Sequence, residues 1–211
     1  LGAIAKLTDW LRLGVVYDSP VWYEITEETR QYLATRRIDQ LGEEFTEVLN
    51  PNAINVYDAF TIQTPSKITG SLAIVINKFG LINFDYSRKD YSSMEFRTID
   101  GYEDTHFSDL NWAIYNNLTV ANSYKIGAEI RSNAMSYRAG YRIDGSPYAD
   151  TDQYSDRTGF SLGIGYKFKS STIDLSFEKY NKQSNHQLYD AGLTNQASID
   201  NNNTIIKLSI T

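Results

Sequence analysis

The chain has 211 residues, of which 41% are hydrophobic, and its formal net charge is −6. This acidic balance, with no dense basic run, argues against a nucleic-acid-binding protein, and the absence of cysteine excludes a disulfide framework and a cysteine metal site. The longest apolar run, 72–76, is far shorter than the roughly 20 residues of a membrane-spanning helix. A spanning strand of about 9–11 residues remains possible.

Average composition leaves two classes of protein open. A mean hydropathy of −0.43 describes a soluble globular protein, but it also fits a membrane β-barrel, whose strands dilute apolar residues with polar ones. The 16 tyrosines suit places where a ring is half in an apolar medium and half in water. Because the chain begins at Leu1, any export signal is expected to have been removed or to lie upstream.

Alternation of apolar and polar residues predicts about nine strands in simple up-and-down order. In the strand 10–18, Leu11, Leu13 and Val15 share one face, and Arg12 lies on the other. The same pattern predicts further strands at 68–76, 81–87, 118–131, 135–143, 159–168, 172–180 and 203–211.

Two hairpins predict which residues face each other. Around a turn at 132–134, Ile130 would oppose Tyr137 and Glu129 would oppose Arg138, so that opposite charges support the register. Around a turn at 169–171, the prediction pairs Tyr166 with Leu175, Phe168 with Ile173 and Lys167 with Asp174.

The connections alternate in length, which is typical of bacterial outer-membrane barrels with short periplasmic turns and long outer loops. Short turns are predicted at 8–9, 77–80, 132–134 and 169–171, and long connections at 19–53, 92–117, 145–157 and 183–202.

Two of the long connections have helical character. In the first, Ala34, Ile38, Leu41, Phe45 and Val48 recur at a spacing of three or four, although a glycine weakens this helix. In the second, a helix over 108–118 would begin at Ser108 as N-cap. We expect short helices packed on the barrel rim; a lid that gates a ligand is the alternative. Residues 24–48 contain seven acidic and three basic side chains.

The orientation of the two faces decides the class of protein. In a soluble sandwich the apolar face would point inward. Three features favour the inverse, with the apolar face toward lipid. The polar face has glycines at positions 14, 127, 140, 163 and 165, which suit a crowded interior, and it carries charges of both signs in cross-strand pairs. Aromatic residues end several of the apolar rows, as they do at the interfaces of a membrane barrel.

The segments 118-LTVANSYKIGAEIR-131, 138-RAGYRIDGSPY-148 and 156-DRTGFSLGIGYKF-168 are similar to the C-terminal part of the FadL/TodX family of outer-membrane transporters of hydrophobic compounds. The segments 13-LGVVYDSPVWYEI-25 and 64-TPSKITGSLAIVI-76 resemble earlier family strands. The similarity covers nearly the whole chain, and its motifs are individually loose.

This resemblance implies an all-β fold: a transmembrane up-and-down antiparallel β-barrel of roughly fourteen strands, with an N-terminal hatch, in the outer membrane of a Gram-negative bacterium. Residues 1–211 would form about nine C-terminal strands of this single domain, and the hatch and first strands would be absent from the chain. An open nine-stranded sheet leaves edge groups unpaired in lipid. The remaining N-terminal part of the barrel is therefore an expected partner.

Charged residues on the inward face are the candidate site. The family pattern has an Asp-Arg pair at 156–157, so that Arg157, together with Arg138 and Arg142, is a candidate to hold a fatty-acid carboxylate. The alternative for Arg157 is a structural pair with Asp156 or a neighbouring loop acid. A lumenal charge network is expected from Lys125, Glu129, Arg131, Lys167, Asp174, Glu178 and Lys207.

Other chemistries have little support in the sequence. Asp150, Asp152 and Asp156 are spaced carboxylates, but the glycine and terminal glutamate of an EF-hand are missing, so no metal is expected. His106 and His186 fall in predicted outer loops, and the run 106–109 does not make a catalytic triad. We expect no enzyme activity and no cofactor.

The function implied by the resemblance is passive outer-membrane transport of long-chain fatty acids or similar hydrophobic molecules, with membrane lipid and a hydrophobic small-molecule ligand as partners. The alternative is a non-transporting barrel of this fold that serves another outer-membrane protein in protein secretion or outer-membrane assembly, with the acidic segment 24–48 as docking surface. A soluble β-barrel binding protein is a third reading.

Overall fold

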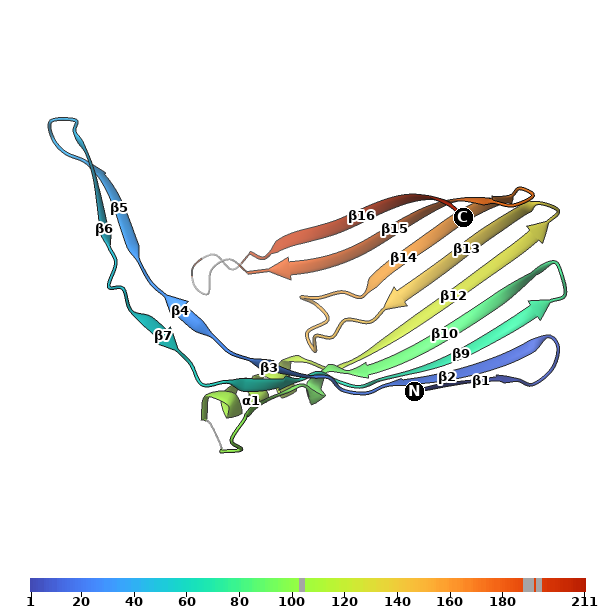
Figure 1. Cartoon of the computed structure of the whole chain (residues 1–211), viewed down its shortest axis with the longest axis horizontal. Coiled ribbons are helices and arrows are strands. Elements are labelled where there is room, and N and C mark those ends of the chain that lie inside the picture. Colours follow the sequence, from blue (N-terminus) through green and yellow to red (C-terminus); the bar gives the residue numbers. More distant parts are fainter. Residues whose placement is uncertain (103–104, 188–191, 193–194) are drawn as a thin grey trace.

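The computed structural model describes residues 1–102, 105–187, 192 and 195–211, and its centre is one antiparallel sheet of nine strands. Neighbours in the sheet follow the chain order without a crossover, as the alternation predicted (Figure 1). Within the described residues, the first and last strands each have a neighbour on one side only. The strands are β1 (Gly2–Lys6), β2 (Leu11–Asp18), β9 (Lys67–Ile76), β10 (Gly80–Asp90), β12 (Val120–Ser132), β13 (Met135–Asp144), β14 (Arg157–Lys167), β15 (Thr172–His186) and β16 (Ala197–Ile210).

One predicted hairpin register is confirmed and the other is wrong by two residues. In β12 and β13, Ile130 lies opposite Tyr137 and Glu129 opposite Arg138, as predicted. In β14 and β15, Tyr166 lies opposite Ile173 rather than Leu175. A shift of two residues keeps every side chain on its own face, so alternation cannot choose between the two registers. The four-residue turn 168–171 decides, and in it the Phe168 N–H donates to the Ser171 carbonyl at 2.7 Å.

The last hairpin is longer than the sequence predicted. Strands β15 and β16 stay paired as far as His186 and Ala197, so half of the predicted loop 183–202 is strand, and His186 ends a strand instead of lying in a loop. The outer part of this hairpin is rich in asparagine, lysine and serine. Its polar residues hid the strands because they lack the apolar alternation used to find them.

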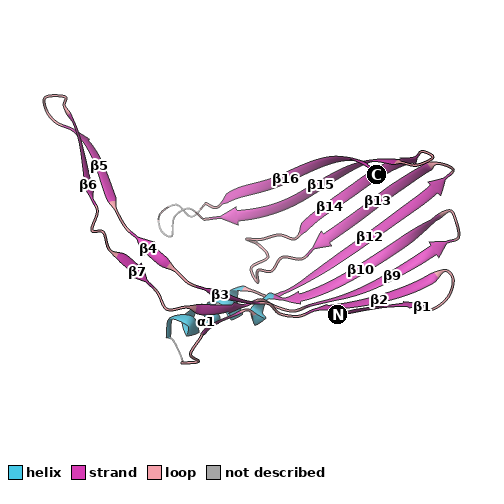
Figure 2. Ribbon diagram, viewed as in Figure 1, coloured by secondary structure: helices cyan, strands magenta, loops and turns pink. Residues whose placement is uncertain are grey.

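The first long connection contains strands where a helix was predicted. After β3 (Trp22–Ile25) come β4 (Glu28–Arg30), β5 (Leu33–Ile38), β6 (Glu44–Leu49), β7 (Ile54–Val56) and β8 (Phe60–Gln63). The prediction failed because Asp39 accepts hydrogen bonds from the backbone N–H groups of Leu41 and Glu43, at 2.9 and 2.8 Å, which closes a hairpin turn at Gly42 with φ +83°. The pairs β4–β7 and β5–β6 form an arm, residues 28–56, that extends away from the main sheet (Figures 1 and 2).

The second long connection contains the predicted helix, α1 (Thr105–Asn117). It begins three residues before Ser108, so the predicted N-cap is inside the helix, and positions 103–104 lie outside the described residues. The short strand β11 (Glu95–Thr98) joins β8 and β3 in a small three-stranded sheet, and α1 lies beside β11. No helix of the described residues is long and apolar enough to cross a membrane.

The nine-stranded sheet has an apolar face that no described part of the chain covers. Ile126, Leu162 and Leu208 expose 52%, 53% and 67% of their surface, and no large side chain among the described residues is fully buried. The opposite side, here called the polar face, carries the charged and small residues, and Glu129 on it is only 14% exposed. In β14, Gly159 and Gly165 of the polar face are buried, whereas the apolar residues between them are exposed, so this strand is better covered on its polar side.

Candidate functional site

The polar face is hollowed into a groove of about 370 Å³ over β10, β12, β13, β14 and β15. Its floor contains Gly127, Gly140 and Gly159. A Cβ on Gly127 would lie 2.5 Å from Asn83 Oδ1, and one on Gly140 would lie 2.8 Å from Ser161 Oγ. The glycines leave room for polar side chains to lie flat over the sheet, as predicted from the sequence for a crowded interior.

A charge network crosses three strands of this face. Arg138 Nε donates to Glu129 at 2.7 Å and Arg138 Nη1 donates to Asp174 at 2.5 Å, while Arg131 also pairs with Glu129. Arg138 lies on β13 and Asp174 on β15, so the contact bridges the strand between them. It can do so because β14 has Gly163 and Gly165 at the crossing, and a Cβ on Gly165 would collide with Asp174.

A second cluster gathers around Asp144 and Tyr180. Asp144 accepts from Arg142 at 2.5 Å and from Arg157 at 2.9 Å. Both guanidinium groups lie over the Tyr180 ring, at 5.3 and 5.4 Å from its centroid. The Tyr180 hydroxyl donates to Glu178.

The fold brings most residues of the predicted lumenal charge network together, but it leaves two of the lysines apart from the carboxylates. Lys207 completes the second cluster through Glu178 at 3.2 Å. Within the described part of the chain, Lys125 and Lys167 have no carboxylate at ion-pair distance, although Lys125 lines the groove.

The three arginines predicted as ligand contacts all hold carboxylates of this chain. The structural partner of Arg157 is Asp144 and not Asp156, whose carboxylate accepts the Ser146 N–H at 2.8 Å. A ligand carboxylate would have to compete with these internal pairs. The binding role of the arginines stays a prediction.

A second hollow, which sequence reasoning missed, lies among the long connections. This aromatic pocket has a volume of about 1110 Å³ and its floor is formed by Phe60 of β8, Phe96 of β11 and Phe107 of α1. The ring centroids are 5.3 Å apart for Phe60 and Phe107, 5.9 Å for Phe96 and Phe107, and 6.0 Å for Phe60 and Phe96. The signal available in the sequence was three phenylalanines in long connections, but only the fold shows that they meet.

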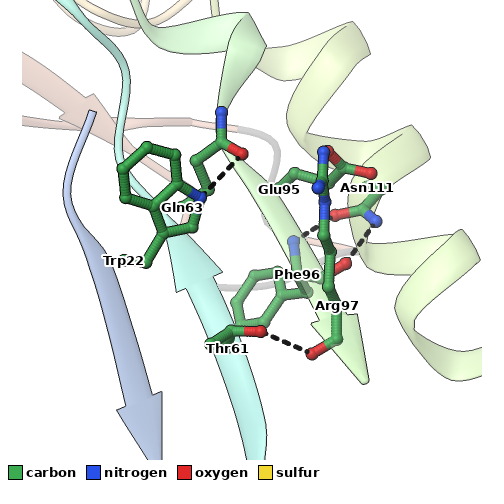
Figure 3. Close-up of polar contacts among 7 residues, drawn as sticks. All are labelled: Trp22, Thr61, Gln63, Glu95, Phe96, Arg97 and Asn111. Atoms are coloured by element: carbon green, nitrogen blue, oxygen red, sulfur yellow. Dashed lines mark hydrogen bonds and ion pairs between the residues drawn. The ribbon is translucent and has the colours of Figure 1, made fainter. Parts of the chain in front are cut away.

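Polar contacts join the elements that carry the three phenylalanines of the aromatic pocket (Figure 3). Asn111 of α1 accepts from the Phe96 N–H at 2.8 Å and donates to the Phe96 carbonyl at 2.9 Å, which fastens the helix to β11 as an added strand would. Thr61 Oγ1 donates to the Arg97 carbonyl at 3.2 Å, and Trp22 Nε1 donates to Gln63 Oε1 at 3.2 Å. The pocket is therefore built from both long connections.

Carboxylates outnumber basic side chains in the lining of the aromatic pocket. Glu27, Asp58 and Asp100 are among its lining residues, and no lysine or arginine lines it in the described ranges. Nearby, Arg97 is bound to Glu95 at 2.5 Å, and this hydrogen bond holds the pKa of the Arg97 guanidinium above its ordinary value. Its charge is therefore neutralised on the small sheet.

Among solved structures, the chain is similar to the Pseudomonas putida toluene transporter TodX, with 16% sequence identity and a TM-score of 0.45. The match covers 84% of this chain and 42% of that chain, so the chain spans less than half of the length of TodX. TodX belongs to the family that the sequence resembles. No protein-family model and no curated protein sequence matches the chain.

Proposed function

We propose that the chain is the C-terminal part of an outer-membrane β-barrel through which hydrophobic small molecules, such as long-chain fatty acids or similar compounds, pass passively. The observation that carries this proposal is the orientation of the nine-stranded sheet. Its apolar face is not covered by the described residues, whereas its polar face contains the groove and the ion pairs between side chains. Exposed apolar patches larger than a few hundred Å² are rare on soluble monomers. In a membrane the same apolar face would contact the hydrocarbon chains of the lipid, as the outer face of a transmembrane barrel does.

Aromatic residues on the apolar face support a position in the bilayer. Tyr166 and Phe168 meet at 4.7 Å next to a short turn, and Tyr86 and Tyr124 meet at 5.3 Å toward the long connections. Tyrosine rings favour the two interfaces of a membrane, where the ring contacts lipid and the hydroxyl contacts water.

The free edges of the sheet support a larger barrel. β1 and β16 expose backbone N–H and C=O groups, and each unpaired group costs several kcal/mol in the hydrocarbon core. We infer that further strands, about five in a fourteen-stranded barrel, close the sheet, and that they come from the remaining N-terminal part.

The two hollows suggest a route. The aromatic pocket would collect ligands at the outer end of the barrel, and the groove on the polar face lies inside it. If the ligand is a fatty acid, Arg157, Arg138 and Arg142 are its proposed carboxylate contacts.

The test is fractionation of native cells, followed by uptake. The proposal expects the protein in the outer membrane, with heat-modifiable mobility on a gel, and faster uptake of labelled hydrophobic compounds in cells that produce it. A protein that stays in solution without detergent would overturn the membrane orientation and the transport reading together.

A second candidate function rests on the arm. Residues 28–56 project from the sheet in Figure 1, and an isolated two-stranded hairpin of this kind is only marginally stable in water. A partner in protein secretion or outer-membrane assembly would stabilise it. If deletion of 31–52 abolishes co-purification of another outer-membrane protein and leaves uptake unchanged, this alternative is favoured.

A further inference from the structure

We propose that the aromatic pocket is a binding site for uncharged hydrophobic molecules and that it discriminates against hydrophobic anions, including carboxylates. The inference rests on the proposed function and narrows its ligand class. It is carried by the combination of an aromatic floor with three carboxylates and no lysine or arginine in the described part of the pocket lining.

The floor of the pocket fits flat apolar molecules. The rings of Phe60, Phe96 and Phe107 are all partly exposed, so each presents surface to the pocket. Ile99 and Leu110 add aliphatic surface. Aromatic side chains supply large apolar contact area, and their offset or tilted arrangements accommodate a further ring.

The carboxylates of the lining, Glu27, Asp58 and Asp100, are all exposed and come from three separate segments. Asp100 also accepts the Tyr102 N–H at 3.3 Å, which keeps this carboxylate near the pocket wall. The described lining contains no lysine or arginine to offset them, and its basic side chain is His106, so an anionic ligand is repelled while that imidazole is neutral.

The surroundings reinforce this sign of charge. The four long connections between strands of the main sheet contain 17 acidic and four basic residues, which gives them a net charge of −13. These connections are 19–66, 91–119, 145–156 and 187–196. The rest of the chain therefore has a net charge of +7. An anion approaching from the long connections meets the negative region before it reaches the arginines of the polar face, and those arginines already hold carboxylates.

The size of the effect follows from exposure. Solvent and salt screen exposed charges, so each carboxylate should lower the affinity for a monoanion by a factor of about two. The three together give a discrimination of about three- to tenfold, which should shrink at about 1 M salt.

A matched pair of fluorescent probes tests the inference. N-phenyl-1-naphthylamine is uncharged, and 8-anilino-1-naphthalenesulfonate has the same skeleton with one negative charge. Binding of both is measured to the native protein in lipid nanodiscs, with empty nanodiscs subtracted. We expect the triple variant E27Q/D58N/D100N to bind the sulfonate about three- to tenfold more tightly and the uncharged probe unchanged.

A second triple variant serves as control. E43Q/E47Q/D152N removes the same charge from other parts of the long connections, and these three side chains form no hydrogen bond or ion pair within the described residues. It should leave sulfonate binding within about twofold of wild type. An equal gain in both triple variants would refute a local effect and overturn the inference.

Two further variants show whether the probes occupy the pocket. Phe107→Ala removes part of the floor, and Ile99→Trp adds a larger side chain to the pocket lining at a residue that is 54% exposed. Both should weaken the uncharged probe severalfold. If neither does, or if E27Q/D58N/D100N leaves the sulfonate unchanged, the inference is wrong while the proposed transport stands. If correctly inserted protein supports no uptake of hydrophobic compounds in cells, the proposed function itself fails.

Discussion

Substitution of Leu162 by arginine tests which face of the sheet meets lipid. Leu162 is the sixth of the eleven residues of β14, and its cross-strand neighbours are Ala139 and Phe177. Eleven residues of strand extend about 36 Å, so a tilted strand spans a hydrocarbon core of about 30 Å with Leu162 near its middle. Arginine at the midplane on the lipid face of a barrel costs about 2–4 kcal/mol. The folded population should therefore fall by a factor of about 30 to 1000.

The assay is reversible urea unfolding of the complete protein in phospholipid vesicles, followed by tryptophan fluorescence. Phe168→Arg, at the strand end, should cost only about 0–1 kcal/mol because it lies near the interface. Ser161 lines the groove on the polar face, so Ser161→Arg should lower the free energy of unfolding by less than about 1 kcal/mol. Equal losses at Leu162 and Phe168 would refute the lipid-facing assignment, because a buried protein core has no such depth profile.

Three further predictions concern the polar face and a turn. Arg138→Met should destabilise the same vesicle-folded protein by about 1–3 kcal/mol, because Glu129 and Asp174 each lose a partly exposed cationic partner. Lys167→Met breaks no ion pair among the described residues and should cost less than about 0.5 kcal/mol. Equal costs would show that the charge network does not stabilise the protein. Gly159→Val should cost about 1–3 kcal/mol, because the new side chain meets the Tyr180 ring, and unfolding midpoints indistinguishable from wild type would contradict the groove geometry. Lys6 donates a hydrogen bond to Asp9 at 2.6 Å, which lowers the pKa of the Asp9 carboxyl. The stabilisation from this ion pair is therefore present above the unfolded pKa of about 4 and is lost as the pH falls through the lower folded pKa. The difference in urea midpoint between wild type and Asp9→Asn should therefore shrink toward zero as the pH falls from about 6 to about 3, and a difference independent of pH would be against it.

Strand number, order and the sorting of faces were predictable because they depend on local chemistry. A strand places alternate residues on opposite sides, so Leu11 and Leu13 had to share a face whatever the rest of the chain did. The same reasoning placed Glu129 opposite Arg138, where charge and apolar pairs agreed on one register.

The register of β14 and β15 and the structure of the arm were not predictable in this way. Moving a strand by two residues leaves the faces unchanged, so the pairing of Tyr166 depended on the turn that follows it. In the arm, apolar spacing matched a helix by coincidence, and the turn at Asp39 overrode it.

The sequence by itself determined that this chain alternates apolar and polar residues along about nine strands, and that charges of both signs share the polar side. Only the tertiary structure decided that Arg138 reaches Asp174 across Gly165, and that Phe60, Phe96 and Phe107 meet under three carboxylates. The physical reason is range. Alternation acts between neighbours in the chain, whereas Arg138 and Asp174 are 36 residues apart, as are Phe60 and Phe96, and these pairs meet only when the sheet and its connections are folded.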